Sequence, residues 1–156
     1  MDLIKIEDFK KGEEFLVFEL IKTCFGEFVA PEYSAAGNRF FYDYIEPGKI
    51  AERFLQGDIL LTAQCNGKIV GVIEVRDHNH ICLLFVDKFW HGKGIAKRLV
   101  GKAVALCREK NKGLKYLEVN ASPYSEKIYA KMGFKKISDL QDVNGLKFVP
   151  MVLELP

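Results

Sequence analysis

The sequence predicts a mixed α/β fold, in which a mostly antiparallel sheet contains one parallel βαβ crossover and is flanked by helices. Helical periodicity dominates the first third of the chain, whereas three consecutive apolar strands follow from residue 59. A strand over residues 80–86, a helix and a strand over residues 114–119 then form one βαβ unit. With 156 residues, the chain is expected to form a single domain over residues 1–156.

The first third is predicted to hold one short strand and a group of helices. Apolar side chains at three- and four-residue spacings indicate the first helix, which ends before Pro31. Pro47 opens the last helix of the group and Gly57 closes it. The predicted elements are a strand over residues 3–6 and helices over residues 13–28, 35–44 and 48–55.

The middle of the chain reads as a meander of three strands, over residues 59–65, 68–75 and 80–86. Asn66-Gly67 is a strong signal for a tight hairpin between the first two strands. The third strand, H-I-C-L-L-F-V, is apolar at successive positions, which predicts a central strand that is covered on both faces.

The second half continues with a helix that follows the third strand of the meander. Its apolar stripe contains Ile95, Leu99, Ala103 and Leu106, and Gly113 is the expected C-cap. A strand over residues 114–119 and a short helix over residues 125–132 come next. Two strands, over residues 134–137 and 146–155, complete the chain around a turn at residues 142–145.

Composition and charge argue against a nucleic-acid-binding, secreted, membrane or metal-binding protein. The net charge of +2 gives no reason to expect a nucleic-acid partner. The N-terminus is too charged for a signal peptide, and no apolar run approaches the roughly 20 residues that span a bilayer. The four cysteines lack C-x-x-C spacing, which favours buried reduced thiols over disulfides or a metal site. We therefore expect a cytoplasmic protein without a metal or a membrane partner.

The stretch W-H-G-K-G-I-A-K-R-L, residues 90–99, places Gly92 and Gly94 between a strand and a helix. Such a turn exposes backbone N–H groups at the positive end of a helix, which is a geometry that binds phosphate. The P-loop pattern G-x-x-x-x-G-K-S/T is absent. A dinucleotide-binding loop would need glycine where Lys97 stands, together with a second nucleotide-binding half.

Two segments resemble the GNAT superfamily of acetyl-CoA-dependent N-acetyltransferases. L-F-V-D-x-x-x-H-G-K-G-I-A-K-R-L resembles that family's pattern Gln/Arg-x-x-Gly-x-Gly/Ala after a strand, with His91 in place of Gln or Arg. Residues 120–134, N-A-S-P-Y-S-E-K-I-Y-A-K-M-G-F, are similar to the family's segment that ends Y-x-x-x-G-F. Together with the order of strands, the resemblance covers about residue 59 to the C-terminus.

The resemblance implies acetyl-CoA as co-substrate, bound where strands 80–86 and 114–119 splay apart. The pantetheine arm would pair with the backbone of the first strand, and the pyrophosphate would lie in the glycine turn. The implied cofactor-binding residues are Leu84, Phe85, Val86, His91, Gly92, Lys93, Gly94, Ile95, Ala96, Lys97, Ser122 and Tyr124. Lys93, Lys97, Arg98 and Lys102 could reach the 3′-phosphate or could form a solvated helix face.

The same resemblance places a general acid at Tyr129, whose phenol can protonate a leaving thiolate; a core tyrosine is the alternative. An alkylamine arrives protonated and needs a base. His80 is the candidate base, because it precedes the implied cofactor contacts and is expected to share strand parity with Cys82, Leu84 and Val86. Glu118, on the neighbouring strand, is the alternative base.

The implied activity is transfer of an acetyl group to a primary amine of a small molecule or peptide, by direct attack in a ternary complex, in a monomer or homodimer. A non-catalytic acyl-CoA sensor of the same fold and an NAD-binding module are the alternatives. The aromatic segments 28–33 and 39–44 could line an acceptor pocket or belong to the core.

Overall fold

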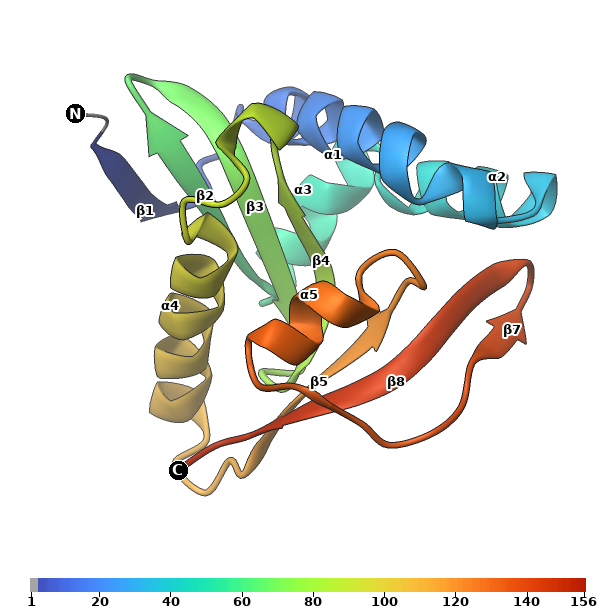
Figure 1. The fold of residues 1–156 in the computed structure, drawn as a ribbon. Helices are drawn as coiled ribbons and strands as arrows, with labels where there is room; N and C mark the ends of the chain where they lie inside the picture. Colours follow the sequence, from blue (N-terminus) through green and yellow to red (C-terminus); the bar gives the residue numbers. More distant parts are fainter. Residues whose placement is uncertain (1–2) are drawn as a thin grey trace.

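The computed structural model describes residues 3–156, and its elements follow the predicted order (Figure 1). The strands are β1 (Ile4–Asp8), β2 (Ile59–Cys65), β3 (Lys68–Arg76), β4 (His80–Val86), β5 (Tyr116–Ala121), β6 (Lys135–Lys136), β7 (Gln141–Val143) and β8 (Leu146–Glu154). The helices are α1 (Glu14–Phe28), α2 (Ala35–Tyr44), α3 (Pro47–Leu55), α4 (Ile95–Lys110) and α5 (Glu126–Lys131), with short 3₁₀ helices η1 (Ala30–Glu32) and η2 (Lys88–Trp90).

The strands form one sheet in the order β1-β2-β3-β4-β5-β8-β6, and β7 pairs with β8. Neighbouring strands run antiparallel except β4 and β5, which run parallel and are connected through α4. Helices α4 and α5 lie on one face of the sheet, whereas α1 and α3 lie on the other (Figure 1). This arrangement confirms the predicted mixed sheet with one βαβ crossover.

Each face of the sheet has its own hydrophobic core, because successive side chains of a strand point to opposite faces. Leu99 of α4 and Leu117 of β5 are fully buried on one side. Ile21 of α1, Ile50 of α3 and Val72 of β3 are fully buried on the other. As predicted, β4 is a central strand and supplies side chains to both cores.

Strands β4 and β5 separate soon after they meet. Within residues 3–156 they pair through His80–Glu118 and Ile81–Val119, and β5 then continues beside β8 while β4 diverges from it. The free edge of β4 beyond Ile81 therefore faces a V-shaped opening in the sheet. This splay is the feature on which the candidate site is built.

A β-bulge near the splay changes which side chains of β4 point to the same face of the sheet. Glu74 of β3 lies opposite Leu83, but Val75 lies opposite Ile81, so that Cys82 is an extra residue in β4. Cys82 packs with the core under α1 and α3, whereas Leu84 and Val86 pack with the core under α4 and α5. The expectation that His80 shares a face with Leu84 and Val86 was wrong, because the inserted residue reverses the alternation.

Two boundaries also differ from the prediction. Helix α4 ends at Lys110 and is capped by Asn111, whose N–H donates to the Cys107 carbonyl, so Gly113 is not the cap. The C-terminal segment contains a third strand, β7, which forms a hairpin with β8. Its exposed sequence Q-D-V shows no apolar alternation that could have revealed it.

All four cysteines are free thiols, and Cys24, Cys65 and Cys107 are buried, as predicted. Among the described residues, no helix has both the length and the apolar character that crossing a membrane requires.

Candidate active site

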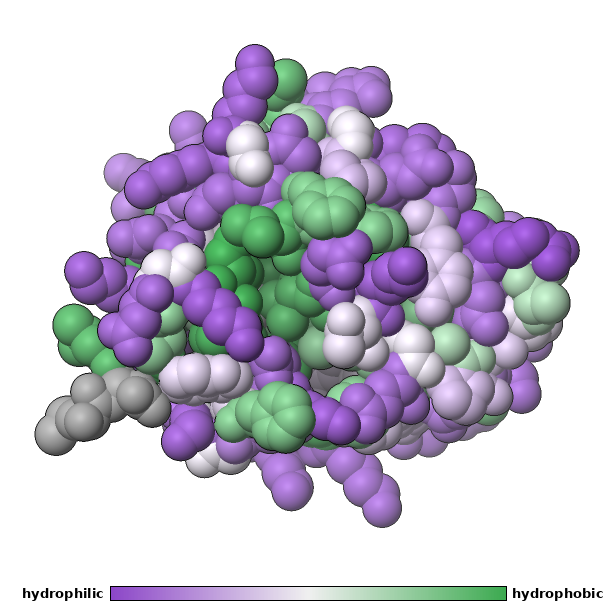
Figure 2. Space-filling model, turned by 90° about the horizontal axis from the view of Figure 1, so that it is seen from above, coloured by the Kyte–Doolittle hydropathy of each residue, from purple (hydrophilic) through white to green (hydrophobic). Residues whose placement is uncertain are grey.

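The opening between β4 and β5 leads into a cavity of about 410 Å³. Its walls come from β4, the glycine turn, the start of α4, helix α5 and the C-terminal end of α1. Seen from the end toward which β4 points, hydrophobic side chains gather around a hollow in the molecular surface (Figure 2). Of the predicted site residues, the cavity is lined by Leu84, Phe85, Val86, His91, Gly92, Gly94, Ile95, Ala96, Lys97, Tyr124 and Tyr129.

The edge of β4 offers backbone groups to this cavity. The N–H of Asp87 donates to Val70 of β3 at 2.9 Å, and Phe85 lies opposite Val72 of the same strand. Because backbone groups of a strand alternate between its two edges, Leu84 and Val86 direct their N–H and C=O groups away from β3. An extended ligand in the opening can therefore pair with β4 as an additional strand would.

The glycine turn presents further backbone donors. Gly92 and Gly94 have φ angles of +76° and +77°, and a Cβ at either position would meet open space. The first hydrogen bond of α4 runs from the Arg98 N–H to the Gly94 carbonyl at 3.0 Å, so the N–H groups that precede it are left for a ligand. The turn thus leaves backbone N–H groups free at a helix N-terminus, which is the geometry that led the sequence analysis to expect phosphate binding here.

His91 connects the glycine turn to the end of β4. Its Nε2 lies 2.7 Å from the Val86 carbonyl oxygen, to which it must donate. The ring contacts Phe28 of α1, with ring centroids 5.8 Å apart, and Phe28 stacks on Tyr124 at 4.9 Å. The Tyr124 N–H donates to the Glu32 carboxylate at 3.0 Å. The segment from α1 to η1 therefore bridges the two sides of the V-shaped opening.

Tyr129 lies on α5, and its ring packs edge-to-face against Phe134 at 5.2 Å. Burial raises the pKa of Tyr129 above its ordinary value of 10.0. Because the phenol keeps its proton at neutral pH, it can donate a hydrogen bond or a proton into the cavity.

The two candidate bases meet at the closed end of the opening. His80 and Glu118 lie opposite each other in the parallel pair, with His80 Nδ1 4.0 Å from Glu118 Oε2. Burial and then Arg76 lower the pKa of His80, against the opposing influence of Glu118 and Asp77. The imidazole is therefore neutral at pH 7 and able to accept a proton. Neither side chain lines the cavity itself.

Some predicted cofactor contacts lie elsewhere. Ser122 and Lys93 do not line the cavity, although Ser125 does. Ser122 shapes the loop before α5, since its hydroxyl lies 2.8 Å from that of Ser125. Arg98, a candidate for the 3′-phosphate, donates to the Ile4 carbonyl of β1 at 3.0 Å.

Phe28 and Val29 line the cavity and belong to the segment 28–33 that the sequence analysis offered as a possible pocket lining. Other lining residues were missed in the sequence: Cys24, Trp90, Ser125, Ile128, Lys131 and Met132. Lys131 stands within Y-A-K-M-G-F, so the motif itself could have indicated it. Cys24 of α1 carried no such signal, because a helical periodicity shows burial and not the identity of the neighbour.

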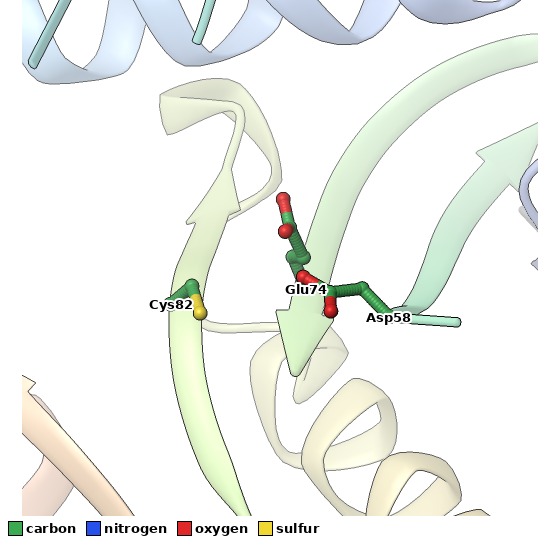
Figure 3. A group of neighbouring side chains, drawn as sticks. All are labelled: Asp58, Glu74 and Cys82. Atoms are coloured by element: carbon green, nitrogen blue, oxygen red, sulfur yellow. The ribbon is translucent and has the colours of Figure 1, made fainter. Parts of the chain in front are cut away.

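A second cluster of polar groups lies on the face covered by α3. Asp58, Glu74 and Cys82 bring potential ligand atoms within 4.8 Å of one another (Figure 3). The Arg53 guanidinium donates to both Glu74 oxygens, at 2.7 and 3.1 Å, and lies over the Tyr44 ring at 3.8 Å. Because this half-buried cation already engages the Glu74 carboxylate, the cluster is better suited to an ion pair than to a metal.

The comparisons with known proteins agree with this geometry. Residues 29–155 match the family model described as an acetyltransferase (GNAT) domain. The chain belongs to the GNAT family and is an acetyltransferase. No curated protein matches the sequence.

Solved structures share the fold at low sequence identity. A GCN5-related N-acetyltransferase from Rhodopseudomonas palustris is 21% identical, with a TM-score of 0.83 and coverage of 99% of this chain and 98% of that one. The PaiA N-acetyltransferase from Thermoplasma acidophilum, in complex with coenzyme A, is 18% identical, with a TM-score of 0.78 and coverage of 98% and 99%. An aminoglycoside 6′-N-acetyltransferase complexed with coenzyme A is 15% identical, with a TM-score of 0.72 and coverage of 97% and 98%.

Proposed function

We propose that the protein transfers the acetyl group of acetyl-CoA to a primary amine of a small molecule or peptide, by direct attack in a ternary complex. The observation that carries this proposal is the closed end of the V-shaped opening. His80 and Glu118 pair at this end, and the β4 residues that line the cavity containing Tyr129 begin at Leu84, four residues further along the strand. We propose that the thioester of the cofactor lies at the cavity end nearest this pair, so that the amine reaches it from the side of His80 and Glu118.

The residues of the cavity fit coenzyme A in shape and charge. The glycine turn would bind the pyrophosphate through backbone N–H groups, and the β4 edge at Leu84 and Val86 would pair with the pantetheine arm. Lys97 and Lys131 both line the cavity and would balance the phosphate charge. The coenzyme A complexes of two structural neighbours support this assignment.

His80 is the proposed base, because its neutral imidazole can take a proton from the incoming ammonium group. Glu118 stabilises the imidazolium that results, from a distance of 4.0 Å. A Glu118 base with His80 as its partner is the alternative. A backbone N–H on the free edge of β4 would hydrogen-bond the thioester oxygen as negative charge develops on it.

Tyr129 is the proposed acid, since it would return a proton to the sulfur of the departing CoA. The nitrogen loses two protons in all: His80 takes the first from the ammonium group before the attack, and the second is lost once the acetyl C–N bond has formed and the C–S bond breaks. That second proton replaces the one that Tyr129 gives to the thiolate, so the products are the amide, CoA–SH and one released proton. Retention of this phenol in the cavity favours an enzyme over the alternative, a non-catalytic acyl-CoA sensor of the same fold. We further propose action in the cytoplasm, as a monomer or homodimer, on an acceptor other than nucleic acid.

A panel of amines tests the proposal. Purified protein is mixed with acetyl-CoA and with polyamines, amino acids, aminoglycosides or peptides, and release of free thiol is measured. At least one amine class should produce thiol and an acetylated product of the expected mass. Tight binding of acetyl-CoA without turnover across the panel would favour the sensor, and thermal stabilisation by NAD but not by CoA would contradict both.

A further inference from the structure

The carbonyl oxygen of Val86 already has two hydrogen-bond donors, one from His91 and one from Cys24. His91 Nε2 donates to it at 2.7 Å, and the Cys24 thiol of α1 lies 3.5 Å away. Burial raises the pKa of Cys24 to about 11, so the thiol keeps its proton and is a donor. Since a carbonyl oxygen has two lone pairs, little capacity is left for a third donor.

This carbonyl is also the last acceptor on the free edge of β4. An arm that pairs with β4 as a strand needs acceptors for its amide N–H groups, and Leu84 and Val86 are the residues whose carbonyls face the opening. An amide hydrogen bond to Val86 therefore requires one of the two present donors to leave.

His91 is the donor that can leave. It is exposed on the turn between η2 and α4, so its ring can rotate into solvent. Cys24 is buried within α1, with 6% of its surface exposed, and its sulfur cannot withdraw without disturbing the core. The movement of His91 would cost its contact with Phe28 and its hydrogen bond.

We propose that the His91 side chain competes with the pantetheine arm of coenzyme A for the Val86 carbonyl, and so lowers the affinity of this protein for coenzyme A. The inference rests on the proposed function in placing the arm in the V-shaped opening. It assigns a role to the one position where the glycine motif departs from Gln or Arg.

Equilibrium binding of two ligands tests the competition. Coenzyme A is compared with adenosine 3′-phosphate 5′-diphosphate, which carries the nucleotide but no pantetheine arm. His91→Ala removes the donor, and His91→Phe removes it while keeping a ring against Phe28. Both variants should lower the Kd for coenzyme A about three- to tenfold, as expected for one hydrogen bond, and leave the Kd for the nucleotide unchanged.

Cys24→Ala is the matched control, because it removes the other donor to the same carbonyl. It should tighten binding of coenzyme A less than the His91 variants do, because a thiol is a weak hydrogen-bond donor and its loss leaves the bond from His91 in place. Tightening in Cys24→Ala but not in the His91 variants, weaker binding in those variants, or an equal change for both ligands would overturn the competition. Unchanged affinity for coenzyme A would refute this inference alone, whereas a wild-type protein that does not bind coenzyme A would refute the proposed function as well.

Discussion

His80 Nδ1 lies 4.0 Å from Glu118 Oε2, at the point where β4 and β5 cease to pair. The backbone pairing sets this approach, because the two residues are register partners in the parallel ladder. The two groups influence each other electrostatically, so the protonation of His80 depends on Glu118 as well as on Arg76.

The dependence of kcat on pH should show the protonation of His80. Activity should fall as the pH drops through the pKa of His80, and burial places this acid limb below the ordinary histidine value of about 6.5. Glu118→Gln removes a charge that raises this pKa and should move the limb to lower pH, whereas Arg76→Ala should move it to higher pH. His80→Gln should abolish the limb and reduce kcat about 10²-fold. A larger loss in Glu118→Gln than in His80→Gln would make Glu118 the base.

Tyr129→Phe should reduce kcat about 10²-fold and leave the affinity for coenzyme A nearly unchanged. The substitution removes the phenolic proton but keeps the ring that packs against Phe134. Steady-state kinetics and equilibrium binding measure the two effects separately. A variant that turns over at the wild-type rate would remove Tyr129 from the mechanism.

Contiguous motifs made part of the site predictable. The glycine turn and Tyr129 each lie within a short sequence pattern whose geometry is local, and the structure places both at the cavity. The bulge at Cys82 could not be predicted, because β4 is apolar on both faces and one inserted residue leaves no visible break in alternation. The contact of Phe28 with His91 depends on how α1 crosses the sheet, which helical periodicity does not specify.

Gly94→Glu should abolish binding of coenzyme A. A side chain here would occupy the space where the pyrophosphate is proposed to lie, and its negative charge would repel the phosphates. Gly67→Glu is the matched control, since Gly67 has a similar φ of +79° and equally open surroundings in the β2–β3 turn. Calorimetric titration should show binding in the control alone. Retained binding in Gly94→Glu would mean that the turn does not hold the phosphates.

The burial of the Glu74 carboxyl group predicts a pH dependence of stability. Burial raises the pKa of Glu74 to about 7 in the folded protein, with Asp58 adding to the increase and Arg53 opposing it. A raised pKa means that the stabilisation is complete below the unfolded value of 4.5 and is lost as the pH rises through about 7. The melting temperature of wild type relative to Glu74→Gln should therefore be higher at pH 5 than at pH 8. A constant difference between the two proteins would contradict the raised pKa.

Helix α2 and the β7–β8 hairpin meet through two glycines, Gly37 and Gly145. A Cβ at Gly37 would collide with the Gly145 carbonyl oxygen, the same atom that accepts a hydrogen bond from the Ser34 N–H at 3.3 Å. Gly37→Ala should therefore destabilise the protein by about 1–3 kcal/mol, because the gain in helix propensity is smaller than the cost of forcing the backbones apart.

Gly101→Ala provides the matched control for Gly37→Ala, since Gly101 lies within α4 and a Cβ there meets open space. This change should stabilise the protein by about 0.5–1 kcal/mol through helix propensity alone. Chemical denaturation of both variants measures the opposite signs. Equal stabilisation by the two substitutions would show that the β7–β8 hairpin can move away from α2 at no cost in stability. The contact between Gly37 and Gly145 would then not be what positions α2 next to β8.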